Sequence, residues 1–118
     1  MIKFAQAMSA LIGQTVTLTS IGPAGHLKTS HGTFDECTWM PDTKTITIRA
    51  ARYIVIGLES HHIEVRPGEL SVLLSRNNAY GAMVIDIIAF TNADPSDQYT
   101  IADHLRSAKH MLKEWETQ

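Results

Sequence analysis

The spacing of apolar residues constrains this chain most, because it changes along the sequence from a period of two to a helical period. From Thr15 onward, Val16 and Leu18 alternate with threonines, which is typical of a half-buried β-strand. Short alternating stretches, bounded by Gly, Pro, Asp and Ser, continue to about residue 66. The pattern predicts a small antiparallel meander of four or five strands in the β-rich residues 14–66.

Several strands can be placed within this β-rich part. A hairpin is expected with arms at Thr33–Met40 and Thr45–Arg49, because a Pro-Asp-Thr-Lys turn separates them. Further extended pieces are expected at Tyr53–Leu58 and Ile63–Val65. Around Leu27 the sequence is compatible with either a loop or a weak strand.

Both ends of the chain have helical spacing instead. A short amphipathic helix that ends at Gly13 is predicted by the apolar residues Phe4, Met8 and Leu11. A second helix, at residues 99–116, is predicted by apolar residues that recur every three or four positions at Ile101, Leu105, Ala108, Leu112 and Trp115. Thr100 and Asp103 resemble a capping box at its start.

Residues 68–91 are compatible with a helical segment and with a mixture of helix and strand. The run Met83–Phe90 is almost continuously apolar, which suits a buried helix and a central strand equally. A chain of 118 residues has the size of one domain. We therefore expect a single α+β domain over residues 1–118, with an N-terminal antiparallel sheet of four to six strands followed by C-terminal helices.

The composition argues against several classes of protein. Ten Lys and Arg against twelve Asp and Glu give a net charge of -2, which leaves no electrostatic footprint for a DNA or RNA polymer. The single cysteine, Cys37, excludes an intramolecular disulfide, agrees with a reducing compartment, and lies in an alternating strand as a core residue would. The longest apolar run is broken by Asp86, so a membrane span is not predicted. The expected compartment is the cytoplasm.

The C-terminal helix carries the first candidate binding groups. Arg106, His110 and Lys113 lie at i, i+4 and i+7, on the face opposite the apolar stripe. They form either a solvated basic face or a phosphate grip, in which a guanidinium and an imidazolium contact adjacent oxygens. Tyr80, next to Gly81, is either an exposed ring that stacks on a base or a partly buried tyrosine at the end of an element.

Metal binding and catalysis have weaker support in the sequence. The β-rich half holds four histidines, His26, His31, His61 and His62. Two adjacent histidines in a strand point to opposite faces, so surface positions suit them better than a zinc site or a metal-dependent enzyme. The sequence contains neither a G-x-S-x-G nor a P-loop motif. We expect no enzyme, no metal and no cofactor.

In its length, in its order of elements, and in the Tyr80, Asn92–Asp94 and cationic-helix features, the chain resembles the first Thoeris anti-defence family. Members of this phage family sequester cyclic ADP-ribose isomers that bacterial TIR-domain immune enzymes make. The resemblance implies a non-catalytic homohexameric sponge in the host cytoplasm, which blocks Thoeris signalling and, through a second pocket for cyclic di- or trinucleotides, CBASS signalling.

The resemblance also implies site residues. For cyclic ADP-ribose it implies Tyr80 as the stacking ring, Asn92 and Asp94 as polar contacts, and Arg106 and His110 as phosphate contacts. The family is expected to have arginine at both helix positions, so His110 departs from its pattern.

The second pocket would use His31, Gly32 and Arg52. An alternative function is a small-barrel phage structural or regulatory adaptor, whose last helix docks on a protein partner.

Overall fold

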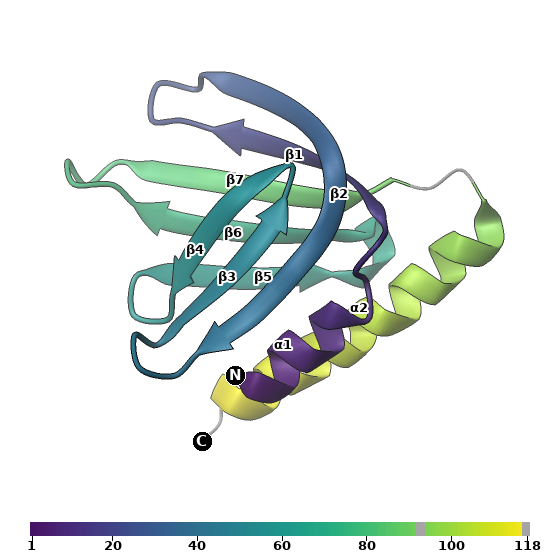
Figure 1. The fold of residues 1–118 in the computed structure, drawn as a ribbon. Coiled ribbons are helices and arrows are strands. Elements are labelled where there is room, and N and C mark those ends of the chain that lie inside the picture. The colour runs from purple at the N-terminus through teal and green to yellow at the C-terminus, as the bar shows by residue number, and fades with distance from the viewer. Residues whose placement is uncertain (92–93, 117–118) are drawn as a thin grey trace.

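The part of the chain that the structure describes folds into two helices and seven strands, with one short 3-10 turn (Figure 1). The computed structural model describes residues 1–91 and 94–116. The elements in chain order are α1 Ile2–Ser9, β1 Thr15–Ile21, β2 Leu27–Met40, β3 Thr45–Ala50, β4 Arg52–Gly57, β5 His61–Arg66, η1 Pro67–Glu69, β6 Ser71–Asn77, β7 Met83–Phe90 and α2 Pro95–Glu116.

All seven strands form one antiparallel sheet, with the order β4-β3-β2-β1-β7-β6-β5. The α+β class is therefore confirmed. The first 66 residues supply five strands, and the segment that the sequence left open supplies β6 and β7. Apart from Asp86, strand β7 carries apolar residues on both of its faces: Ile88 and Phe90 are buried in the core, and Ile87 is half-buried on the opposite face.

The meander has four strands, β1 to β4, which pair consecutively through hairpins. Strand β5 leaves this series, because it pairs with β6 and not with β4. The region around Leu27, where a loop and a weak strand were both open, is the first part of β2. Consecutive strands β4 and β5 therefore form the two edges of the sheet.

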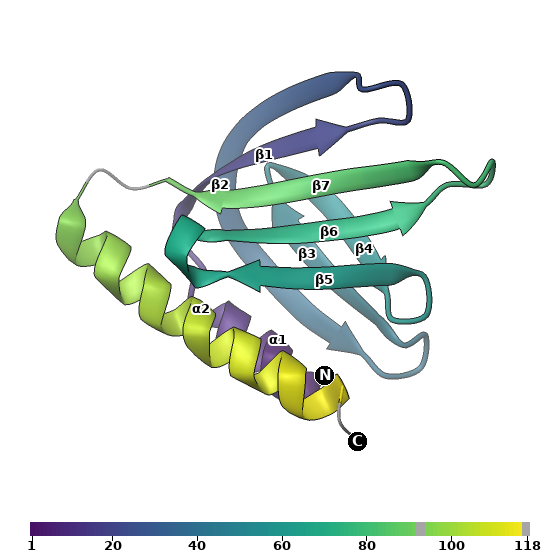
Figure 2. The ribbon, with the colours of Figure 1, turned by 180° about the vertical axis from the view of Figure 1, so that it is seen from behind.

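The long strand β2 lets the sheet fold back on itself. Residues 27–33 of this strand pair with β1, whereas residues 34–40 pair with β3, and the register shifts between Phe34 and Glu36. A bulge of this kind bends a strand and increases its twist. In Figures 1 and 2, β3 and β4 consequently lie over the layer formed by β1, β7, β6 and β5.

Helices α1 and α2 pack against each other and close one end of the curled sheet (Figure 2). Their buried side chains join the inner face of the strands in one core, which includes Phe4, Met8, Leu11, Ile101, Leu105 and Ala108. Cys37 belongs to the same core, as predicted. Its burial, together with the negative charge of Glu36, raises the pKa of the thiol to about 12.

Helix α2 begins at Pro95 and not at residue 99, so the expected capping box is wrong. Asp94 Oδ1 accepts the N–H of Ser96 at 2.9 Å, which places the capping side chain one turn earlier. Thr100 lies inside the helix, where its hydroxyl donates to the carbonyl of Ser96. The side chain of Trp115 lies outside the described part. Within the part described, we find no helix that combines the length and the apolar character needed to cross a bilayer.

Candidate functional site

The inner face of the sheet changes from apolar to polar toward the end that the helices leave uncovered. On β1, the inner residues Val16 and Leu18 are fully buried, and the next inner residue is Ser20. Four other strands carry a polar residue in phase with their buried positions in the same way. We call the resulting set the mouth cluster, which consists of Ser20, Arg52, His61, Arg76 and Asp86.

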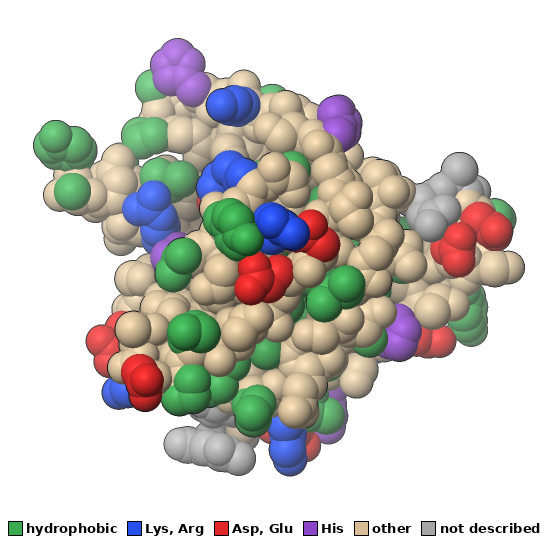
Figure 3. All heavy atoms as spheres, in the orientation of Figure 1, with side chains coloured by type: hydrophobic (Ala, Val, Ile, Leu, Met, Phe, Trp, Pro, Cys, Tyr) green, Lys and Arg blue, Asp and Glu red, His purple; other side chains and the backbone are tan. Residues whose placement is uncertain are grey.

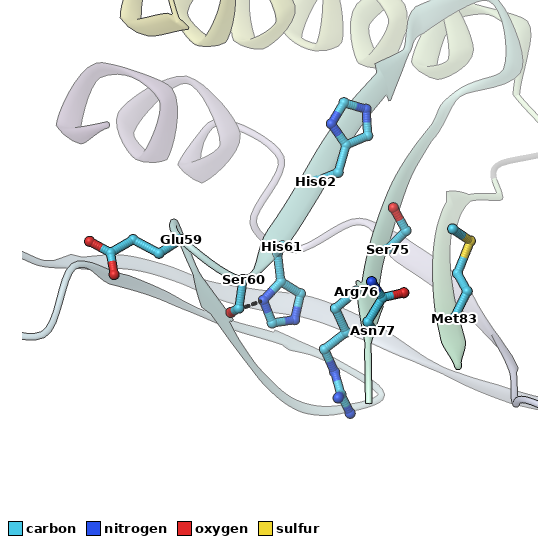
Figure 4. A pocket seen from close by; sticks show the side chains of 8 residues that line it. All are labelled: Glu59, Ser60, His61, His62, Ser75, Arg76, Asn77 and Met83. Carbon is cyan, nitrogen blue, oxygen red and sulfur yellow. Dashed lines mark hydrogen bonds between the residues drawn. The ribbon is translucent and has the colours of Figure 1, made fainter. Parts of the chain in front are cut away.

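The mouth cluster lines a cavity of about 250 Å³ between β4 and the layer behind it. A second cavity of about 290 Å³ shares His61 and Arg76 as lining residues. Figure 4 shows that His61 and Arg76 point to the same side of β5 and β6, whereas His62 points away from them. Each cavity is slightly smaller than the roughly 300–1,000 Å³ of a typical small-molecule site, so one chain alone would enclose only part of a large ligand.

Arg52 is fixed across the mouth by an acid on a distant strand. Its Nη2 donates to Asp86 Oδ1 at 3.0 Å, and the same oxygen accepts the hydroxyl of Ser20 at 2.6 Å. The guanidinium also donates to Ser20 Oγ at 3.2 Å. Because the Asp86 side chain is only 14% exposed, this pair connects β4 to β7 in a partly desolvated setting.

Gly32 explains how Arg52 reaches this position. A Cβ on Gly32 would lie 2.7 Å from the Cα of Ala51, so only glycine leaves space for the turn between β3 and β4. Ala51 has a φ of +69°, in the left-handed region that favours glycine, and Ala50 pairs with Arg52 across it. The tight turn starts β4 at the mouth with Arg52 directed inward.

Arg76 differs from Arg52 in its surroundings. Within the part of the chain that the structure describes, its side chain forms neither a hydrogen bond nor an ion pair, and it is exposed beside His61, its partner in the β5–β6 register. Lys28 faces Ser20 in the β1–β2 register and therefore lies on the same side of the sheet. Asp86 offsets the charge of Arg52, whereas Arg76 and Lys28 leave the mouth positively charged. Figure 3 shows Lys and Arg side chains on the side of the molecule that carries the β1–β2 and β6–β7 hairpins.

His61 contributes a neutral ring to the mouth. Its Nδ1 accepts the backbone N–H of Gly57 at 3.1 Å, so the neutral ring carries its proton on Nε2. Burial lowers the pKa of His61, and the nearby charge of Arg76 lowers it further. Near neutral pH the ring therefore offers one N–H donor.

Tyr80 lies at the tip of the β6–β7 hairpin. Its side chain is exposed, as in the first of the two interpretations that the sequence left open. The residue is 95% exposed. The turn beneath it is held by Asn78 Oδ1, which accepts the N–H groups of Tyr80 at 2.9 Å and Ala82 at 3.0 Å. The ring is thus presented by the same hairpin that carries Arg76.

Two other residues expected at the cyclic ADP-ribose pocket lie on α2. Arg106 and His110 are exposed there, where Arg106 pairs with Asp103, and His110 Nε2 lies 3.2 Å from Glu114 Oε1. Figures 1 and 2 show α2 at the end of the molecule away from the β6–β7 hairpin. A single chain therefore does not bring these residues to Tyr80, so the pocket stays a prediction for an assembly. Asp94 caps α2, and Asn92 lies outside the described residues.

The residues expected at the second pocket are partly brought together. Gly32 supports the turn that positions Arg52, and both lie at the inner face. His31 lies on the outer face, where its Nδ1 is 3.1 Å from Thr17 Oγ1. The period of two separates His31 from Arg52, because adjacent residues of a strand point to opposite faces.

Sequence reasoning missed four members of the mouth cluster as site residues: Ser20, His61, Arg76 and Asp86. A signal for each was present, because each continues the inward phase of an apolar pattern, as Arg76 does after Val72 and Leu74. Only the sheet order, which places β7 beside β1, shows that these positions meet.

The described residues contain no group of three or more His, Cys, Asp or Glu side chains arranged to hold a metal ion. No protein-family model matches the sequence. Neither a curated protein nor a solved structure matches it.

Proposed function

We propose that the protein binds an anionic nucleotide at the mouth cluster and sequesters it unchanged. The observation that carries the proposal is the placement of Arg76, for which the described residues supply no acidic partner, in one cavity with the fixed guanidinium of Arg52. A guanidinium matches two phosphate oxygens with parallel N–H donors. Two such groups beside the Nε2–H of His61 would suit a phosphate or a pyrophosphate.

Tyr80 supports a ligand that also has a base. Its ring is almost fully exposed on the hairpin that carries Arg76, and Gly81 holds the tip with a φ of +81°. An exposed aromatic ring near cationic groups is a stacking platform. Stacking of one base on such a ring contributes about 1–3 kcal/mol to the free energy of binding. We therefore assign phosphate contacts to Arg52 and Arg76 and the base contact to Tyr80.

The contacts within the mouth favour binding over chemistry. Asp86 Oδ1 already accepts from Ser20 and Arg52, and an arginine stays protonated and cannot act as a general base. The Nδ1 of His61 is engaged by a backbone N–H and does not receive a proton from Ser20. Ser60 Oγ lies 3.1 Å from the same nitrogen, but the Gly57 N–H competes for this acceptor, and Ser60 does not line the cavity that holds Arg52 and Asp86.

The ligands that we propose are cyclic ADP-ribose isomers and cyclic oligonucleotides. The protein would act in the bacterial host as a phage sponge, and would block Thoeris signalling and, with cyclic oligonucleotides, CBASS signalling. The small cavity volume supports an assembly, because a neighbouring subunit would have to enclose the rest of such a ligand. In a homohexamer, Arg106 and His110 of one subunit would meet Tyr80 of another.

The proposal is tested by native mass spectrometry of the purified protein with cyclic ADP-ribose isomers and cyclic di- and trinucleotides. We expect a hexamer that gains the intact ligand mass, and titration calorimetry should then give the Kd. A protein that gains no mass with any of these ligands would contradict the proposal.

Variants locate the site. Arg52→Ala and Arg76→Ala should weaken binding, whereas Arg49→Ala should not, because Arg49 pairs with Asp35 on the outer face. Arg106→Ala and His110→Ala test the contribution of α2. If only the α2 variants lose ligand, the binding site is on the helix and the assignment to the mouth is wrong.

A further inference from the structure

Strand β5 leaves one edge open. It is the last strand in the sheet order and pairs only with β6. Among the described residues, no backbone hydrogen bond reaches its other edge. Alternate residues of such a strand direct N–H and C=O groups away from the sheet, where they can pair with another strand.

A groove of about 340 Å³ runs between this edge and α2. Four consecutive residues of β5, His62 to Val65, line one wall. Since adjacent side chains of a strand point to opposite faces, a wall of consecutive residues consists largely of the backbone edge. Leu112 contributes an apolar surface from the helix, beside the buried Ile63 and Val65.

The charge in the groove is positive. Lys109 and Lys113 line the helical wall, both are exposed, and neither has an acidic partner within the part of the chain described. The acid on the β5 wall, Glu64, is held by Arg66 at 3.1 Å. The two lysines are therefore available to an acidic ligand.

We propose that an extended acidic segment of a partner protein binds in this groove as an additional strand. Its main chain would pair with the edge of β5, its apolar side chains would pack toward Leu112, and its carboxylates would contact Lys109 and Lys113. Strand addition of this kind takes affinity from main-chain hydrogen bonds and specificity from alternate side chains.

A foreign segment fits better than a second copy of this chain. The other edge strand, β4, contains no acidic residue, and its one charged residue is Arg52. It would place no carboxylate against the two lysines. The proposal goes beyond nucleotide binding, and it uses α2 and the β5 edge, not Arg52, Asp86 or Arg76.

The probe is a short peptide of alternating valine and glutamate, acetylated, amidated and labelled with a fluorophore. Binding is followed by fluorescence anisotropy, and the site is located by NMR of the 15N-labelled full chain. We expect saturable binding, with amide shifts concentrated at residues 62–65 and along the facing turn of α2. A peptide with lysine in place of glutamate, and one with N-methylated main-chain amides, should both bind at least about tenfold more weakly.

Charge reversal tests the two lysines. The double variant Lys109→Glu, Lys113→Glu should lose about tenfold in affinity for the acidic peptide. The matched control reverses two exposed lysines that line neither the groove nor the mouth, Lys3→Glu and Lys44→Glu, and should bind the acidic peptide as the native chain does. Native-like NMR spectra establish that each variant is folded.

Three results would overturn the proposal: equal binding of the acidic and basic peptides, equal loss in the two double variants, and shifts at the mouth in place of residues 62–65. Retained nucleotide binding in the Lys109→Glu, Lys113→Glu variant keeps this result separate from the proposed function.

Discussion

The two ends of the curled sheet use the same strand geometry for opposite purposes. At the helix-capped end, the inner positions of β1, β6 and β7 hold apolar side chains that belong to the same core as the buried side chains of α1 and α2. At the mouth, the next inner positions of the same strands hold Ser20, Arg76 and Asp86. The comparison teaches that alternation decides which way a side chain points, whereas the residue type decides whether that position becomes core or binding site.

Removing a large side chain at the capped end should have the largest effect. Leu105 is fully buried between the helix and the sheet, so Leu105→Ala should lower the free energy of unfolding by about 2–5 kcal/mol. Urea denaturation followed by circular dichroism measures this change. Ligand affinity of the folded variant should be unchanged, and a selective loss of ligand would mean that the two ends are not separate.

The opposite result is expected at the mouth. Arg76→Ala should lower nucleotide affinity by about ten- to a hundredfold, since a hydrogen bond to a charged group contributes about 1.5–3 kcal/mol. Its unfolding free energy should stay within about 0.5 kcal/mol of the native value, because Arg76 is exposed and forms no hydrogen bond or ion pair with the residues that the structure describes. Calorimetry and urea denaturation on the same sample make the comparison, and a large stability loss would show that Arg76 supports the fold.

The ion pairs Arg52–Asp86 and Arg49–Asp35 allow the inner and outer faces of the sheet to be compared. Arg52→Ala should cost about 1–2 kcal/mol of stability, because it leaves the mostly buried Asp86 without its cation. Arg49→Ala removes a more exposed pair with Asp35 and should cost less than about 1 kcal/mol. Thermal and urea unfolding measure the loss of stability in each variant. An equal loss in Arg52→Ala and Arg49→Ala would mean that the mouth is as well solvated as the outer surface.

The smallest effect is a pH dependence at His61. The pKa of this residue is lowered in the folded state from 6.5, so the unfolded chain takes up the proton first as pH falls. The stability associated with His61 is therefore complete above pH 6.5 and is lost as pH falls from there through the folded-state pKa. The difference in Tm between the native chain and His61→Asn should shrink over this interval, and a difference that stays constant would exclude the assignment.

The class of the fold followed from residue spacing alone, because period-two alternation and the helical stripe of α2 are both strong patterns. The structure of Met83–Phe90 did not follow from spacing, because a strand with apolar residues on both faces has little alternation to detect. The long pairing of β1 with β7 and the open edge between β4 and β5 were equally invisible, because both depend on contacts between distant segments.

The candidate site was harder to predict than the fold. The resemblance implied Arg52 and Tyr80 for two different pockets, whereas both lie on the side of the mouth. The helix residues Arg106 and His110 were chosen for their charge, but in one chain their neighbours are acids of the same helix. Charge and spacing describe one element at a time, whereas a binding site needs side chains from several elements.

The hydrogen bond between Ser20 and Asp86 has a consequence for how the protein is made. These residues are 66 positions apart, and they meet only when β7 pairs with β1. A chain emerging from the ribosome can form its first hairpins early, but contacts of this sequence separation form slowly. The mouth therefore cannot form in a nascent chain that does not yet contain β7. Once it is complete, a ligand that holds Ser20, Arg52 and Arg76 together would keep the first and last strands joined and delay unfolding of the whole sheet.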